Sequence, residues 1–123
     1  MPDISARAAI AAAKLAALRE SYREELPQRL EEILAAWRHY DGAPSPEGLL
    51  AMRRLVHKLA GTAGLFGLRE LGQHAMALEL LLDHTMRATP PARPAVECQV
   101  NQQLAMLCRV AEAALLATGE APS

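Results

Sequence analysis

Short breaks that contain glycine or proline separate four long stretches in which apolar residues recur every three or four positions. The breaks are DGAPSPEG at residues 41–48, the glycine-containing stretch at 64–67 and ATPPARP at 88–94. Spacings of three and four place side chains on one face of an α-helix, whereas a half-buried strand needs alternation. The pattern therefore predicts amphipathic helices over residues 20–40, 45–64, 68–87 and 96–117. Ser45 and Pro46 have the N-cap and first-turn arrangement that opens a helix.

An alanine-rich amphipathic segment, residues 4–18, precedes the first long helix. Pro27 lies inside the periodic run that follows, and proline lacks a backbone donor and clashes with the preceding helical turn. We expect Pro27 to kink or divide this run, so that a short N-terminal helix leans on a longer second one.

Composition agrees with an all-α fold. Hydrophobic residues make up 51% of the 123 residues and aromatic residues only 3%, which favours packed helices over strands. We predict an up-down antiparallel four-helix bundle with a short N-terminal capping helix, built as one domain over residues 1–123. Its core covers about residues 15–118, and residues 119–123 form a short flexible tail. The predicted core stripes are Leu26, Leu30, Ile33, Leu34 and Trp37; Met52, Leu55, Val56, Leu59 and Ala63; and Leu68, Leu71, Ala75, Leu78, Leu82 and Met86.

Charge and cysteine content exclude several classes of function. The net charge of −1 gives no basic field, so we expect neither nucleic acid nor membrane as a partner. Asp3, Arg7 and Lys14 interrupt the start of the chain, where a signal peptide needs an apolar centre. Cys98 and Cys108 lie too far apart in one helix to be bridged, and we expect reduced core thiols in a cytoplasmic protein.

His57 occupies an unusual position on the predicted 45–64 helix. At about 100° per residue it lies about 140° from the centre of the apolar stripe and faces outward. Gly61 and Gly64 follow one and two turns later on the same side, and Ala60 beside them is also small. Interior helical glycine costs roughly 0.5–1 kcal/mol relative to alanine. Glycine at these positions therefore indicates that the surface next to His57 must be free of side chains.

Three cations lie near the histidine in sequence: Arg53 and Arg54 in the preceding turn and Lys58 beside it. A neutral imidazole is a nucleophile, small residues admit a partner protein, and cations stabilise an added phosphoryl group. This combination fits attack on a phosphoryl group held by another protein. A surface histidine without a role, beside glycines that only end the helix, fits the same pattern.

The stretch HKLAGTAGLFG resembles the signature of histidine-containing phosphotransfer (HPt) domains. The matching positions are His57, Leu59, Gly61, Ala63 and Gly67, followed on the next helix by Leu71, Leu78 and Glu79. The upstream segment REELPQRLEEIL is similar to the acidic, leucine-rich helix of that family. The resemblance covers about residues 15–83 in detail.

The resemblance implies a phosphorelay protein with no kinase activity and no cofactor of its own. His57 would accept a phosphoryl group from the phosphoaspartate of a receiver domain and pass it to the aspartate of another receiver domain. These receivers would belong to response regulators, to a hybrid sensor histidine kinase, or to both. Glu79 would orient the imidazole, and Mg²⁺ would belong to the receiver. Leu65 would be an apolar residue at the rim of the docking face. Ala60 departs from the family, which commonly has lysine at this position beside the phosphoryl group.

Other interpretations stay open. The same small-residue face could belong to a helical docking module in which His57 is never phosphorylated. Residues 4–18 could pair two copies of the chain, although we expect a monomer. His39, His74 and His84 lack the spacing of metal ligands, so we predict no metal site. Four methionines at positions 52, 76, 86 and 106 are interpreted as core gap fillers.

Overall fold

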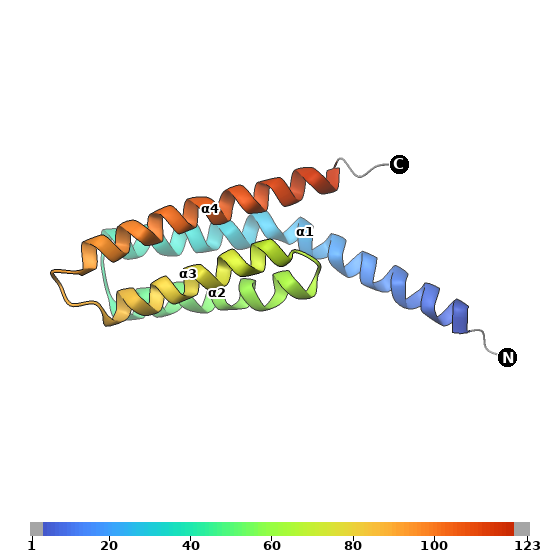
Figure 1. The fold of residues 1–123 in the computed structure, drawn as a ribbon, viewed down its shortest axis with the longest axis horizontal. Coiled ribbons are helices and arrows are strands. Elements are labelled where there is room, and N and C mark those ends of the chain that lie inside the picture. The colour runs from blue at the N-terminus through green and yellow to red at the C-terminus, as the bar shows by residue number, and fades with distance from the viewer. Residues whose placement is uncertain (1–3, 120–123) are drawn as a thin grey trace.

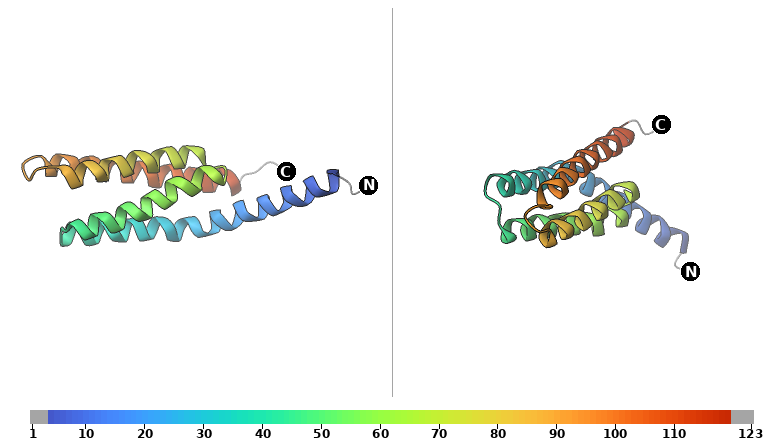
Figure 2. Two further views of the ribbon diagram at one scale, coloured as in Figure 1. Left: turned by 90° about the horizontal axis from the view of Figure 1, so that it is seen from below. Right: turned by 60° about the vertical axis from the view of Figure 1, so that its left-hand side comes forward.

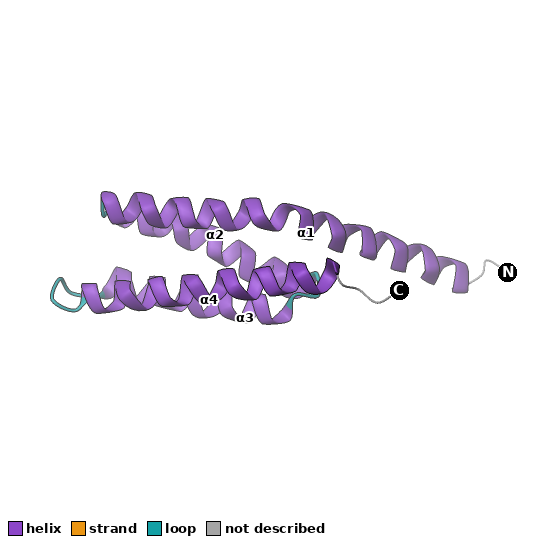
Figure 3. Cartoon of the chain, turned by 90° about the horizontal axis from the view of Figure 1, so that it is seen from above, coloured by secondary structure: helices purple, strands orange, loops and turns teal. Residues whose placement is uncertain are grey.

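The computed structural model describes residues 4–119. This part of the chain folds into four α-helices. They are α1 (Ile4–Gly42), α2 (Pro46–Leu65), α3 (Arg69–Arg87) and α4 (Arg93–Gly119), joined by short connections (Figure 1). Figure 3 draws only helices and loops over this range. The all-α prediction is confirmed.

Each helix runs antiparallel to its neighbours in the bundle. Contacts join α1 to α2, α2 to α3 and α3 to α4, and α4 returns to α1 (Figure 2). The most extensive of these interfaces lies between α2 and α3. Because His57 is on α2, this interface decides what surrounds it.

The separate N-terminal capping helix is not seen, so that part of the prediction is wrong. Residues 4–18 belong to α1, which is one helix with Pro27 inside it. A proline inside a helix costs about 3 kcal/mol or more. Leu26 and Leu30 are buried on either side of Pro27, so packing against the bundle holds both parts of the helix in place. Tertiary burial therefore outweighs the local effect of the proline.

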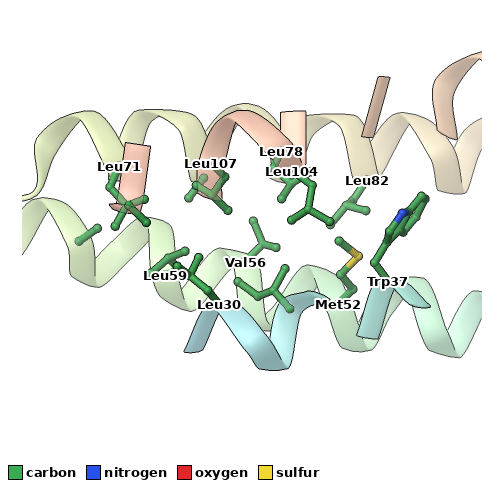
Figure 4. Packing of buried hydrophobic residues seen from close by; sticks show 14 of the residues in the cluster. Leu30, Trp37, Met52, Val56, Leu59, Leu71, Leu78, Leu82, Leu104 and Leu107 are labelled. Atoms are coloured by element: carbon green, nitrogen blue, oxygen red, sulfur yellow. The ribbon is translucent and has the colours of Figure 1, made fainter. Parts of the chain in front are cut away.

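One apolar cluster from all four helices forms the core (Figure 4). It includes Trp37 from α1, Met52 and Val56 from α2, Leu78 from α3 and Leu107 from α4. The predicted stripes are buried except for Leu34, Leu55 and Met86, which are half-buried and pack against the cluster.

The two ends of α2 are fixed by local chemistry. At its start the hydroxyl of Ser45 accepts a hydrogen bond of 3.0 Å from the backbone N–H of Gly48, as predicted for an N-cap. At its end Gly67 has φ +86°, a left-handed conformation in which a side chain is strained. The backbone N–H of Leu68 then donates to the carbonyl of Ala63, which closes the helix end.

Helix α4 begins at Arg93, earlier than predicted, because Pro94 is tolerated in a first turn that needs no donor from it. Its cysteines are both free, but Cys98 is exposed and Cys108 half-buried. The prediction of core thiols is therefore wrong for Cys98. Of the predicted tail, residue 119 ends α4, and residues 120–123 lie outside the described range.

The first part of α1 extends beyond the other helices (Figure 1). Every side chain from residue 4 to residue 21 is exposed, including Ile4, Ile10 and Leu18.

No helix within residues 4–119 is long and apolar enough to cross a membrane.

Candidate functional site

Close packing of α2 against α3 builds the surface that holds His57. Gly72 of α3 is buried, and a Cβ added there would lie 3.3 Å from the backbone N of Gly64 and 3.4 Å from the carbonyl O of Ala60. The missing side chain thus lets α3 approach the backbone of α2. This approach brings side chains of the two helices within hydrogen-bonding distance.

His57 is exposed on α2 and held from α3. Its side chain is 70% exposed, and Nδ1 lies 2.8 Å from Oε2 of Glu79, whose side chain is only 14% exposed. An ionised carboxylate can only accept, so Nδ1 carries the proton in this contact. In the neutral imidazole Nε2 then keeps its lone pair, and it has no hydrogen-bond partner among the described residues.

Glu79 has a second partner in Arg53, one turn before His57 on α2. A terminal guanidinium nitrogen of Arg53 lies 3.2 Å from the same carboxylate oxygen, Oε2. The Nε–H of Arg53 donates to Oδ1 of Asp83, one turn after Glu79 on α3. This hydrogen bond, followed by the charges of the two carboxylates, raises the pKa of Arg53 above its ordinary value. Arg53 is therefore engaged with carboxylates beside the imidazole.

The other two predicted cations do not join this cluster. Lys58 is exposed and lines a small cleft with Arg29 and Glu32 of α1, on the opposite side of α2 from Glu79. Arg54 is exposed on α2. Ala60, where the resemblance leads one to expect lysine, is half-buried against α3.

Gly61 and Gly64 leave part of the α2 surface bare. A Cβ added at either position would meet no atom within 4 Å. Packing within the chain therefore does not explain either glycine. Leu65, at the end of the same helix, is 69% exposed.

Two apolar residues of α3 extend this surface and were not predicted to belong to it. The His57–Glu79 contact sets a register that places Met76, one turn earlier on α3, opposite Ala60, one turn later on α2. Met76 is 58% exposed, so its interpretation as a core gap filler is wrong. Leu80, one turn after Met76, is 59% exposed. The exposure of both residues could have been predicted from the sequence, because at about 100° per residue each lies about 160° around the helix from the buried Leu78.

Behind the site, a hydrogen bond fixes α1 to α2. The hydroxyls of Tyr22 and Thr62 lie 2.8 Å apart, and Thr62 also donates to the carbonyl of Lys58. Phe66 packs against the Tyr22 ring at 4.9 Å between centroids. Burial raises the pKa of Tyr22, partly offset by its hydrogen bond to Thr62. These contacts hold α2 in place beneath the bare surface.

The remaining histidines form no metal centre. Within residues 4–119 no three His, Cys, Asp or Glu side chains are grouped so that they could hold a metal ion. His74 instead contacts the side-chain amide of Gln103 on α4, with 3.1 Å between Nδ1 and Nε2.

The fold and the site together define a class: a helical protein that presents one exposed histidine, oriented by a carboxylate, at a surface with few side chains. The family model of the Hpt domain matches residues 17–114, and the chain belongs to this family. Hpt domains are phosphoryl carriers that act by histidine phosphotransfer in phosphorelays and typically interact with receiver domains. No curated protein and no solved structure matches the chain.

Proposed function

We propose that His57 is the phosphoacceptor of this Hpt domain and that Glu79 orients it. The observation that carries the proposal is the 2.8 Å contact between Nδ1 of His57 and Glu79, which in the neutral imidazole leaves the lone pair on Nε2 of an exposed side chain. A nucleophile must offer a lone pair in a direction that a partner can reach. Nε2 meets both conditions.

On this chain the imidazole is the group that forms and breaks bonds in the proposed reaction. The Nε2 lone pair attacks the phosphorus of a receiver phosphoaspartate, an N–P bond forms, and the aspartate carboxylate leaves with the electrons of the broken O–P bond. The proton on Nδ1 stays hydrogen-bonded to Glu79 throughout. In the reverse direction, the carboxylate of a second receiver attacks the phosphohistidine. The required Mg²⁺ is supplied by the receiver.

The docking surface for the receiver surrounds His57 on α2 and α3. It consists of Ala60, Gly61, Gly64 and Leu65 from α2, together with Met76 and Leu80 from α3. Exposed apolar residues gathered around a bare backbone surface favour a protein partner. Such partners are response-regulator receivers, free or within a hybrid sensor histidine kinase, and the chain acts in the cytoplasm as a monomeric single domain.

This chain places less positive charge beside the phosphoryl group than the family commonly does, because Ala60 stands where the family commonly has lysine. Arg53 shares the carboxylate of Glu79 with the imidazole, and Arg54 and Lys58 lie on other sides of α2. In the proposed complex Arg53 supplies positive charge beside the imidazole, and Arg54 and Lys58 supply it toward the receiver rim.

Phosphorus NMR after treatment with a small phosphoramidate donor tests the proposal. We expect a single acid-labile phosphoramidate resonance that is absent from the His57→Gln variant. His84→Gln is the matched control, because His84 is exposed on α3. A folded protein that takes up no phosphoryl group, even from a phosphorylated receiver, would contradict the proposal.

The alternative function is a docking module that uses the same surface without phosphorylation. Gly61 and Gly64 favour docking in either case, because a Cβ at these positions meets nothing inside the chain. Binding to a receiver should survive His57→Gln under both functions. Only phosphotransfer requires the imidazole, so measuring binding and transfer on the same variant separates them.

A further inference from the structure

Glu79 is held by a chain of interactions that extends beyond His57. Its Oε2 accepts from Nδ1 of His57 at 2.8 Å and forms an ion pair with a terminal nitrogen of Arg53 at 3.2 Å. Arg53 uses a different nitrogen, Nε, to donate to Asp83. The guanidinium therefore spans two carboxylates on α3, and Asp83 reaches His57 only through Arg53 and Glu79.

We propose that Asp83 is a positioning residue that holds Arg53 against Glu79 and thereby fixes which nitrogen of His57 carries the proton. The proposal deepens the phosphoacceptor function proposed for His57 and rests on it for its effect on phosphorylation. Asp83 itself does not touch the imidazole.

The geometry of the guanidinium explains why a second carboxylate matters. Its donors lie in one plane, so a hydrogen bond at Nε limits where the terminal nitrogens point. With Asp83 accepting from Nε, a terminal nitrogen of Arg53 lies 3.2 Å from Oε2 of Glu79. Without Asp83, the half-exposed Arg53 side chain gains rotational freedom and competing contacts with water.

The charge of Arg53 explains why its placement matters to His57. A carboxylate with only 14% of its side chain exposed and no cationic partner would turn toward water. Glu79 would then no longer accept the hydrogen bond from Nδ1 of His57. Arg53 pairs with the carboxylate and so keeps its oxygen at the imidazole.

Nitrogen NMR of the unphosphorylated protein tests the proposal directly, at alkaline pH where histidine is neutral. The ¹⁵N shifts of His57 report which ring nitrogen is protonated. We expect Nδ1–H in the original protein and a mixture of tautomers in Asp83→Ala. Asp83→Asn keeps an acceptor for Nε and should largely restore the original tautomer. Glu70→Gln, on the exposed first turn of α3, is the control for carboxylate removal.

Phosphorylation rates with a small phosphoramidate donor provide the second readout. Asp83→Ala should lower the initial rate about five- to tenfold, the effect of losing one accessible charge-assisted hydrogen bond. If Asp83 acts through Arg53, then Arg53→Gln combined with Asp83→Ala should lower the rate no further than Arg53→Gln alone.

Two results would overturn the role of Asp83. The first is an unchanged His57 tautomer in Asp83→Ala, and the second is a full additional loss of rate in the double variant. If the original protein is not phosphorylated at all, the proposed function of His57 fails. The tautomer measurement still decides whether Asp83 positions the imidazole.

Discussion

Replacing Gly61 with leucine should block transfer from a receiver while stabilising the fold. Gly61 lies one turn after His57, and a Cβ there would meet no atom within 4 Å. The new side chain therefore projects away from the bundle without displacing anything. Replacing glycine in a helix interior gains about 0.5–1 kcal/mol in the free energy of unfolding. Urea unfolding should show this gain.

The same side chain stands where the receiver must approach. Displacing reacting groups by about 1 Å can lower a rate about 10²-fold. A leucine side chain reaches farther than this from the helix backbone. We therefore expect transfer from a phosphorylated receiver to fall at least about 100-fold. A small phosphoramidate donor does not need the whole surface and should phosphorylate His57 in Gly61→Leu as it does in the original protein.

The assay compares three proteins with both donors: the original chain, Gly61→Leu and Ala105→Leu. Ala105 is exposed on α4, which lies diagonally across the bundle from α2, so its replacement tests for a general effect of an added surface leucine. Normal transfer from the receiver to Gly61→Leu would refute the docking surface. Loss of folded protein in Gly61→Leu would refute the claim that this position is free of internal contacts.

Three further measurements test how the helices are held in place. Gly67→Ala should lower the free energy of unfolding by about 1–2 kcal/mol, because φ is +86° at this position; a stabilised variant in urea would contradict this. Tyr22→Phe removes the hydrogen bond to Thr62 and should cost about 1 kcal/mol in the same assay, and an unchanged midpoint would show that this bond contributes nothing. Burial, with the hydrogen bond to Glu97, raises the pKa of Tyr40 to about 12 from its ordinary value of 10.0. As the pH rises, the Tyr40 hydroxyl loses its proton in the unfolded chain before it does so in the folded one. The contribution of Tyr40 to the free energy of unfolding is therefore constant below about pH 10 and falls by up to about 2 kcal/mol toward pH 12. Tyr40→Phe should lack that decline.

The fold was largely predictable because helix periodicity is a local property of the sequence. The position of α2 followed from Ser45 and Pro46 at its start, and the structure has the predicted cap. Pro27 led to a wrong prediction because its cost is local, whereas the burial of Leu26 and Leu30 depends on the other helices. Pattern alone does not reveal how much tertiary burial is available to offset a proline.

The candidate site likewise has features that a single helix predicts and features that depend on how two helices pack. The outward direction of His57 follows from the winding of a single helix, and its exposure agrees. The resemblance to HPt domains suggested Glu79, and the structure brings it to Nδ1. The engagement of Arg53 with Asp83 depends on the register between α2 and α3, which no local pattern contains. Sequence reasoning could therefore list Arg53 as a nearby cation but could not find the carboxylates that hold it.

The glycines around His57 look alike in sequence, yet the structure gives them different physical reasons. Gly67 is needed for a left-handed backbone, and Gly72 for the close approach of α3 to α2. Gly61 and Gly64 satisfy no internal requirement, and each lowers helix stability by roughly 0.5–1 kcal/mol relative to alanine. Nothing within the described chain offsets that cost. The proposed function gives the two glycines a reason, because a receiver that takes or gives a phosphoryl group must come close to Nε2 of His57.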